Sequence, residues 1–467
     1  MIRLNAKQLS KMVDGNLVII GDEFKSDFNV CADEIIIDSR KVTDHSLFIP
    51  FNGEKVDAHK FIPDVMQTCH ITFTEEKKSE ILKKSGASEL PDGYYIEVKS
   101  SISALQMLGK AIRSEYKKKV IGVTGSVGKT TTREMITTAL SSSMNVFSTE
   151  GNNNSQIGVP LTLSSILDKP SDVSVIEMGI SEPGGMDKLT NMVQPDIAVV
   201  TMIGVAHIEF MKTREGIRQE KMRIINRMDK NGVVFLNGDD DLLRELKGTL
   251  PVQTFYFGTD DFSDYRAENF KIIRGFQEFD YAHGSDRIHV KLSQPGRHSA
   301  IDMLSALAVA DYFGLDIKMA ADKFTEFKGL RQKIEKRNEG YVVIDDSYNA
   351  SPVSMNASLD LLNDFDSPGR RYAVLGDMFE LGENSPEYHK EVGRHIRDID
   401  NNIDEVILLG KESNLIGQEI VDKDIKVLHF NTNKEAVIYL KENIKSGDMI
   451  LIKASNGMNF NEIANSI

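Results

Sequence analysis

Short hydrophobic runs alternate along most of this chain with longer stretches in which apolar positions repeat with the helical period. The runs 120–123 and 173–176 are typical of buried strands. The stretches 102–116 and 214–228 predict helices. Strands that alternate with helices form parallel sheets, because each helix carries the chain back to the start of the next strand. We therefore expect an α/β protein.

The same pattern divides the chain into three parts, which we expect to be domains. Residues 1–98 combine strand-like runs with charged helical stretches, and residues 99–328 hold a long β/α alternation. Within the second part, residues 260–294 have short alternating runs that predict an antiparallel flap or a small sheet. Residues 329–467 return to β/α alternation, with strands predicted at 341–344, 372–375, 405–409 and 449–452.

Composition restricts the class of protein. A chain of 467 residues with 40% hydrophobic and 27% charged residues has enough apolar side chains for more than one core. The net charge of −14 argues against a nucleic-acid partner. Two cysteines are too few for a disulfide framework, and we find neither a signal peptide nor a membrane-length apolar run. We expect a cytoplasmic monomer without a membrane partner.

A glycine turn between the run 120–123 and a helical pattern carries the clearest chemical signal. Backbone N–H groups in such a turn point inward, the helix N-terminus adds partial positive charge, and a lysine adds a full charge. The two glycines are separated by two residues, whereas the usual P-loop has four. We expect a nucleoside triphosphate to contact Thr124, Gly125, Ser126, Val127, Gly128, Lys129, Thr130 and Thr131.

Polar residues follow two further predicted strands. Glu177 comes directly after the run 173–176, where a Mg²⁺ ligand belongs beside a P-loop. His207 follows the run 196–201, which we expect to neighbour the strand of Glu177; a metal role and a structural role are equal alternatives. The amide-rich segment 151–160 is either a substrate-binding loop or a plain polar loop.

Acidic residues also follow a strand in the third part. Asp345 and Asp346 come after the run 341–344 and could serve a ribose or a metal, or cap a turn. Arg331, upstream of this run, could reach a phosphate. Together these residues predict that the third part closes over the nucleotide.

In this order, the motifs resemble those of the Mur ligases of peptidoglycan synthesis, and most closely the MurF type. The likeness extends over nearly the whole chain, and the short P-loop is the family's own variant. It is carried by Asp38–Lys41, Leu47–Ile49 and Asp57–His59 in the first part, by Thr124–Thr131, Gly151–Pro160, Glu177–Gly179 and Ala206–Glu209 in the second, and by Asp345–Pro352 and Val374–Gly382 with His389 in the third.

The resemblance implies a fold and a reaction. The fold would be a central P-loop ATPase with a parallel sheet, flanked by an N-terminal UDP-substrate domain and a C-terminal Rossmann-like domain. The reaction would be ATP-dependent amide ligation that joins D-Ala-D-Ala to a UDP-N-acetylmuramoyl tripeptide through an acyl phosphate. Two alternatives stay open: a MurF-like paralogue with another amine or carboxylate, and a nucleotide-binding protein without catalysis.

The resemblance also assigns roles to individual residues. One of them, Asp302, stands where the family commonly has asparagine. The resemblance further implies two Mg²⁺ ions and a CO₂-derived carbamate on Lys221. The implied catalytic residues are Lys129, Lys221, His207 and Glu177, and the metal ligands are Thr130, Glu177, His207 and Lys221. Outside the P-loop, the nucleotide would contact His298, Asp302, Arg331 and Asp346, and the substrates would contact Ser39, Arg40, Asn153, Asn154, Asp377, Met378 and Lys453.

Overall fold

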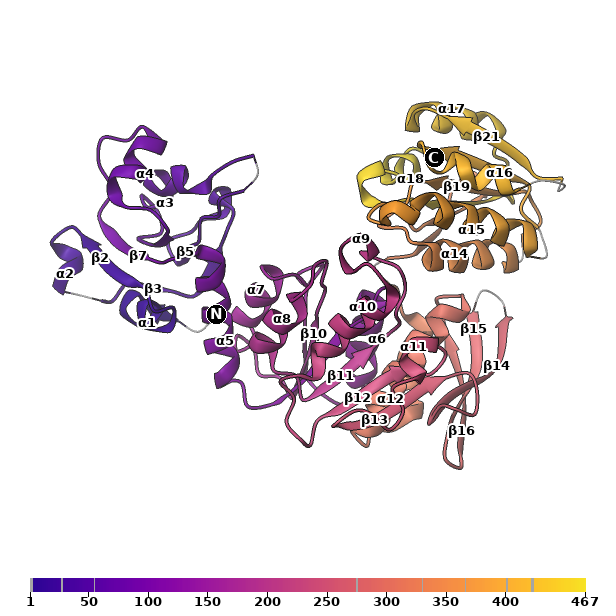
Figure 1. Ribbon diagram of the computed structural model, residues 1–467, viewed down its shortest axis with the longest axis horizontal. Coiled ribbons are helices and arrows are strands. Elements are labelled where there is room, and N and C mark those ends of the chain that lie inside the picture. The colour runs from indigo at the N-terminus through magenta and orange to yellow at the C-terminus, as the bar shows by residue number, and fades with distance from the viewer. Residues whose placement is uncertain are drawn as a thin grey trace.

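The molecule is built around three large β-sheets that follow one another along the chain (Figure 1). The computed structural model describes residues 3–26, 28–53, 55–273, 276–329, 331–365, 367–399, 402–420 and 424–467. The expected α/β class is confirmed, because helices alternate with mostly parallel strands in every large sheet.

The first sheet has five strands in the order β2-β7-β6-β5-β4. Strand β2 is antiparallel to β7, and the other neighbours are parallel. The strands are β2 (Asn16–Ile20), β4 (Glu34–Ile36), β5 (Ser46–Phe48), β6 (Ile71–Thr74) and β7 (Gly93–Glu97), and a separate pair joins β1 (Leu4–Asn5) to β3 (Cys31–Ala32). The helices are α1 (Ala6–Met12), α2 (Glu23–Ser26), α3 (Ile62–Val65) and α4 (Lys78–Ser85).

The second sheet has nine strands in the order β16-β15-β14-β13-β12-β11-β8-β10-β9. Its strands are β8 (Lys119–Thr124), β9 (Val146–Ser148), β10 (Val173–Glu177), β11 (Ile197–Val200), β12 (Val233–Asn237), β13 (Gln253–Gly258), β14 (Tyr265–Ile273), β15 (Phe276–His283) and β16 (Asp286–Leu292). Its main helices are α5 (Ser101–Glu115), α6 (Lys129–Leu140), α7 (Gly158–Ser164), α8 (Gly185–Val193), α9 (Ile208–Met211), α10 (Arg214–Met222), α11 (Asp241–Arg244), α12 (Arg297–Tyr312) and α13 (Ile317–Asp322).

Three expectations for the middle part differ from the structure. The strand before His207, β11, does not neighbour the strand of Glu177, β10, because β8 lies between them and pairs with both in parallel register. The helix predicted over 214–228 ends at Met222, where a 3₁₀ turn takes over. The antiparallel strands expected within 260–294 are present, but they extend the main sheet beyond β13 instead of standing apart from it.

The position of β8 in the middle of the parallel strands decides where chemistry can occur. Strands β9 and β10 lie on one side of β8, and β11 and β12 lie on the other. Ligands bind α/β sheets at such a switch point, beyond the carboxyl ends of the strands. Glu177 pairs in register with Val123 and Val200 pairs with Thr124, so the loop after β8 opens between the ends of β10 and β11.

The helix after this loop is held by a hydrophobic core. Ile121 and Val123 of β8, Ile136 of α6 and Leu304 of α12 are fully buried in one cluster. Burial of each such side chain contributes about 1.5–3 kcal/mol. The start of α6, which receives the loop, is therefore fixed by packing on both its sheet and its helix side.

The third sheet has six strands in the order β17-β18-β22-β19-β20-β21, parallel except for the β17–β18 pair. The four predicted strands are present, and β17 and β21 are additional. The strands are β17 (Lys333–Lys336), β18 (Val342–Asp345), β19 (Arg371–Gly376), β20 (Glu405–Leu409), β21 (Lys426–Phe430) and β22 (Met449–Lys453). The helices are α14 (Pro352–Asp364), α15 (Ser385–Asp398), α16 (Asn414–Glu419), α17 (Asn433–Asn443) and α18 (Asn461–Ser466).

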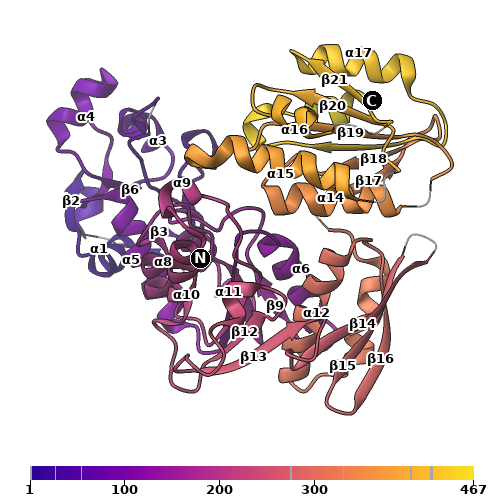
Figure 2. The same ribbon diagram turned by 45° about the vertical axis from the view of Figure 1, so that its right-hand side comes forward.

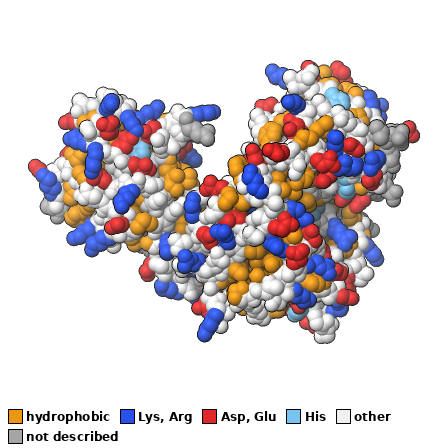
Figure 3. Space-filling view, viewed as in Figure 1, with side chains coloured by type: hydrophobic (Ala, Val, Ile, Leu, Met, Phe, Trp, Pro, Cys, Tyr) orange, Lys and Arg blue, Asp and Glu red, His pale blue; other side chains and the backbone are white. Residues whose placement is uncertain are grey.

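The N-terminal and C-terminal parts both adjoin the middle part (Figures 1 and 2). The space-filling view shows an open notch between the N-terminal lobe and the C-terminal lobe, with the middle part at its base (Figure 3). Among the described residues, we find no helix with the length and apolar character needed to cross a membrane.

Candidate active site

The glycine turn after β8 has the shape of an anion pocket. Gly128 has φ +85°, and a Cβ on Gly125 would lie 1.8 Å from Thr201 Oγ1, so a larger residue fits at neither position without strain. Lys129 Nζ folds back over the turn and donates to the carbonyl oxygens of Gly125 (2.9 Å) and Ser126 (3.3 Å). The backbone and the lysine therefore converge on one point above the turn.

Glu177 is fully buried at the end of β10, beside the first turn of α6. Its Oε1 accepts hydrogen bonds from Thr130 Oγ1 (3.1 Å) and Asn154 Nδ2 (2.6 Å). Its Oε2 has no hydrogen-bond partner, although Arg133 Nε lies 3.4 Å away. Oε2 thus has an ion-pair contact with Arg133 but no hydrogen bond, which leaves its lone pairs free for a cation. Together with the Thr130 hydroxyl, this oxygen fits a hard divalent cation such as Mg²⁺.

Lys221 on α10 reaches the same turn from a second helix. Its side chain is buried, and Nζ donates to Gly125 O at 2.9 Å, the same oxygen that accepts from Lys129. Burial lowers the pKa of Lys221 well below its ordinary value, and the nearby Lys129 charge lowers it further. Burial also lowers the pKa of Lys129, against an opposing effect of Glu177.

His207 lies at the N-terminus of α9 in a left-handed backbone conformation, with φ +62°. Burial lowers the pKa of its imidazole, Glu380 opposes this, and the charges of Lys129 and Lys221 lower it further. Its Nδ1 lies 2.5 Å from Glu380 Oε2 in the loop after β19. The charges of both active-site lysines therefore lower the pKa of His207, and its ring contacts the C-terminal part.

Arg331 enters the same site from the segment before β17. Its Nη2 donates to Thr130 Oγ1 (3.0 Å) and to Asn152 Oδ1 (2.7 Å), and its guanidinium lies over the Tyr348 ring, 3.2 Å from the centroid. A positive charge thus reaches the start of α6 from the C-terminal part, as the sequence predicted. Asn152 and Tyr348 were not predicted individually, although both lie in segments that were singled out.

A second contact region surrounds His298 at the start of α12. Asp346 Oδ2 accepts from Lys453 Nζ (2.5 Å) and Ser358 Oγ (2.7 Å), and Lys453 also donates to Asn349 O (3.1 Å). Burial lowers the pKa of His298, while the Asp346 charge raises it. Lys453 and Asp346 are therefore paired with each other, and their predicted substrate and nucleotide contacts stay predictions.

Asp302 on α12 lies beneath the glycine turn. Its Oδ1 accepts from Thr132 Oγ1 at 2.9 Å and lies 3.0 Å from where a Cβ on Gly128 would be. Burial raises the pKa of this carboxyl to about 7. Asp302 therefore changes its charge near neutral pH.

We expect Asp302→Asn to change how stability depends on pH. Asp302 keeps its proton up to about pH 7 in the folded protein but loses it near pH 4 when unfolded. The folded state binds more protons between these values, so the wild-type protein loses stability as pH rises through this window. Between pH 5.5 and 8 the loss should reach about 2 kcal/mol, and the variant should lack it.

Thermal unfolding of the wild-type protein and Asp302→Asn at these two pH values measures the effect. The melting temperature of the variant should rise relative to the wild type as the pH increases. A constant difference across the pH range would contradict the raised pKa.

The substrate residues predicted in the first part lie apart from this site. Ser39 lines a pocket of about 260 Å³ together with Val42, Phe61, Asp64, Val65 and Thr68. Arg40 is exposed, and Asp38 accepts from its Nε (2.9 Å) and Nη2 (2.7 Å). The structure brings neither residue to the glycine turn.

The two predicted asparagines differ in their surroundings. Asn154 donates to Glu177, as described above, whereas Asn153 is exposed. In the third part, Asp377 accepts from the N–H groups of Lys411, Glu412 and Ser413 at 2.7–3.0 Å and so fixes a turn. Met378 is buried, and its N–H donates to His389 Nε2 (3.0 Å). These contacts hold the loop after β19, and the predicted substrate roles stay untested.

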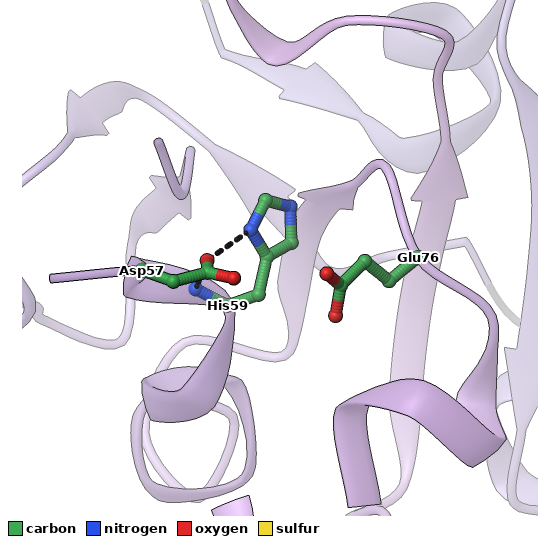
Figure 4. A group of neighbouring side chains, drawn as sticks. All are labelled: Asp57, His59 and Glu76. Carbon is green, nitrogen blue, oxygen red and sulfur yellow. Dashed lines mark hydrogen bonds and ion pairs between the residues drawn. The ribbon is translucent and has the colours of Figure 1, made fainter. Parts of the chain in front are cut away.

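Asp57, His59 and Glu76 form a cluster of potential metal ligands in the first part (Figure 4). His59 Nε2 accepts from Glu75 N–H (3.2 Å), so Nδ1 carries the proton and donates to Asp57 Oδ1, 2.8 Å away. Lys84 Nζ lies 2.5 Å from Asp57 Oδ2 and also contacts Glu76. Both ring nitrogens, both Asp57 oxygens and Glu76 Oε1 have partners, whereas the buried Glu76 Oε2 has none. The contacts that are present hold the surrounding loops together.

Comparison with known proteins identifies the family. The family model of the Mur ligase middle domain matches residues 123–310, and that of the Mur ligase, glutamate ligase domain matches residues 331–456. The UDP-N-acetylmuramoyl-tripeptide–D-alanyl-D-alanine ligase of Bacillus subtilis (strain 168) is 33% identical over 473 residues, which cover 100% of this chain and 99% of that protein. The chain belongs to the Mur ligase family.

Solved structures agree with this assignment. The Mur ligase described here matches a crystal structure of MurF from Acinetobacter baumannii with a TM-score of 0.86 at 24% identity, over 99% of this chain and 98% of that one. It matches the MurF ligase from Thermotoga maritima in complex with ADP with a TM-score of 0.80 at 27% identity, over 93% and 96% of the chains. The family resemblance and the three-part fold expected from the sequence are confirmed.

Proposed function

We propose that this Mur ligase joins D-Ala-D-Ala to a UDP-N-acetylmuramoyl tripeptide at the expense of ATP. The main support for this type of reaction is that four side chains meet at the glycine turn: Lys129, Thr130, Glu177 and Arg331. The full-length match to the Bacillus subtilis ligase supports the choice of substrates. We expect the reaction to take place in the cytoplasm, which supplies ATP.

We propose that each of three domains binds one of the substrates. Residues 1–98 would bind the UDP-linked substrate, residues 99–328 would bind ATP, and residues 329–467 would bind the amine. The contact of Arg331 with Thr130 supports closure of the third domain over the nucleotide. Closure matters because an acyl phosphate hydrolyses when water reaches it.

The first chemical step is phosphoryl transfer. A carboxylate oxygen of the tripeptide attacks the γ-phosphorus, and the bond from that phosphorus to the leaving oxygen of ADP breaks. Lys129 and Arg331 would neutralise the charge on the transferred group, and the backbone of the turn would orient it. Thr130 and Glu177 would hold Mg²⁺, which when bound supplies Lewis-acid stabilisation of the phosphate oxygens.

The second step forms the amide. The amine attacks the carbonyl carbon of the acyl phosphate, the C–O bond to phosphate breaks, and the amine gives up a proton. The contribution of the chain is to place the two substrates together and to keep water out. The net reaction consumes one ATP and releases ADP and phosphate.

We further infer that CO₂ modifies Lys221 to a carbamate. Its lowered pKa favours the neutral amine, which is the form that reacts with CO₂ and releases one proton. The resulting carboxylate would replace a buried amine by an oxygen ligand for a second Mg²⁺, with Glu177 and His207 as the other ligands.

Lys221→Ala tests this inference. We expect kcat to fall about 100-fold, as for loss of a group that supports a metal site. Excess bicarbonate with a short carboxylic acid should restore part of the rate, because the acid fits the space left by the carbamate. Phosphate release measures both effects. Full activity of the variant would reject the carbamate.

The proposed reaction is tested with purified protein, ATP, Mg²⁺, UDP-N-acetylmuramoyl tripeptide and D-Ala-D-Ala. Phosphate and amide product should appear only when every component is present. A panel of other dipeptides and amino acids, used in place of D-Ala-D-Ala, separates this activity from that of a paralogue. Absence of an amide product with any amine would contradict the ligase assignment.

A further inference from the structure

The predicted metal ligand His207 contacts a carboxylate from the other side of a domain boundary. Glu380 lies in the loop between β19 and α15, and its Oε2 lies 2.5 Å from His207 Nδ1. The backbones meet as well, since Glu209 N–H donates to Glu380 O at 3.4 Å. A Cβ on Gly382 would lie 3.3 Å from Glu209 Cα, so glycine permits this close approach.

The backbone at both residues is held in an uncommon conformation. His207 and Glu380 each have φ +62°, in the left-handed region that residues with a Cβ rarely adopt. Such a conformation persists only where the surrounding structure requires it, and it is frequent at functional sites. Here it occurs at the two ends of a single contact.

This contact has a chemical consequence for the imidazole. A neutral histidine has one N–H and one lone pair, and a carboxylate at Nδ1 favours the proton on that atom. The lone pair then lies on Nε2, which is the atom left for a metal. Carboxylates that accept the second ring N–H of a metal-binding histidine fix both its tautomer and its ring orientation. Glu380 lies at ion-pair distance from Nδ1 but outside hydrogen-bond geometry, so it acts on the imidazole through its charge.

The contact between His207 and Glu380 lies beside a pocket that the middle and C-terminal parts of the chain both line. A pocket of about 830 Å³ is lined by Ile208, Glu209 and Lys212, by the segment Asp377–Ser385, and by Lys411 and Glu412. His207 directly precedes Ile208, and Glu380 lies within the segment Asp377–Ser385. A movement of the C-terminal domain would therefore change the surroundings of His207.

We propose that Glu380 is a positioning residue that orients His207 for Mg²⁺ and thereby makes metal binding depend on the position of the C-terminal domain. The proposal rests on the proposed function, because it requires His207 to bind the metal. Coupling of this kind is reciprocal, so the metal would in turn favour the position of the domain that brings Glu380 to His207.

Mn²⁺ binding to the full-length protein tests the proposal. Free Mn²⁺ is followed by electron paramagnetic resonance at saturating AMP-PNP for the wild type, Glu380→Gln, His207→Ala and the double variant. The nucleotide binds Mn²⁺ equally in all samples, so differences report on the protein. We expect Glu380→Gln to weaken Mn²⁺ binding about tenfold. The double variant should bind Mn²⁺ no more weakly than His207→Ala, because Glu380 acts through His207.

Glu383→Gln is the matched control, since Glu383 is an exposed carboxylate in the same loop. It should leave Mn²⁺ binding unchanged, and melting temperatures measured without metal should show that each variant folds. If His207→Ala binds Mn²⁺ as the wild type does, the proposed metal site is wrong. If His207→Ala weakens binding but Glu380→Gln does not, the metal site stands and the role of Glu380 is rejected. If Glu380→Gln changes only the KM for the amine in the ligation assay, the role of Glu380 in metal binding is rejected as well.

Discussion

Replacing Lys129 by alanine should lower kcat for ATP-dependent ligation about 1,000-fold. The ammonium group is held over the glycine turn by two carbonyl oxygens, at 2.9 and 3.3 Å from Nζ. A fixed charge at this point stabilises the transferring phosphoryl group without reorganisation, and loss of one such group costs about 10²–10³ in rate. We place the effect at the upper end because Lys129 is also attracted to Glu177, the proposed metal ligand.

Initial rates of phosphate release, at saturating concentrations of all substrates, measure this effect. Lys188→Ala is the control, because Lys188 is half exposed and lies 3.7 Å from an equally exposed Glu182. An exposed ion pair of this kind contributes about 0–1 kcal/mol, so the control should retain its rate. A Lys129→Ala variant within tenfold of the wild type would contradict the assigned role.

We expect Glu177→Gln to cause a loss of similar size, about 1,000-fold in kcat, by a different route. Glutamine keeps an oxygen that can accept from Thr130 and Asn154. It places an amide where Oε2 now has no hydrogen-bond partner and lies 3.4 Å from Arg133 Nε. The substitution therefore preserves the shape of the site but removes the charge that a divalent cation requires.

The dependence of the rate on Mg²⁺ concentration distinguishes this explanation from misfolding. Glu177→Gln should need more Mg²⁺ than the wild type, and its melting temperature should be compared at the same pH because Arg133 loses a buried partner. The exposed Glu182→Gln serves as the control. An unchanged Mg²⁺ requirement with a normal rate would contradict the metal role of Glu177.

The fold was largely predictable because strand burial and helical period leave a local record in the sequence. Val120–Val123 and Val173–Ile176 are apolar throughout, and both are strands. Lys426–Phe430 contains polar residues and has half-buried positions at the edge of its sheet, so no apolar run marked it. The order of strands was harder to predict, because the neighbour of β8 depends on long-range pairing that the local pattern does not encode.

The residues of the site also differ in whether the sequence alone could predict them. The glycine turn and Glu177 could be found from spacing alone, because strand, turn and helix fix their positions relative to one another. Lys221 has no local signal: it lies on a helix like any solvated lysine, and only the tertiary fold buries it against Gly125. The contact of Glu380 with His207 could not be predicted, because the two residues lie in different parts of the chain and meet only in the folded structure.

The carbonyl oxygen of Gly125 accepts from both Lys129 and Lys221, and this has a consequence for proton traffic. Two ammonium groups on one oxygen repel each other, so the charge of Lys129 lowers the pKa of Lys221. An incoming triphosphate brings negative charge and favours the charged form of Lys129. Nucleotide binding therefore raises the pKa of Lys129, so the affinity for nucleotide should fall as the pH rises through the range in which Lys129 loses its proton.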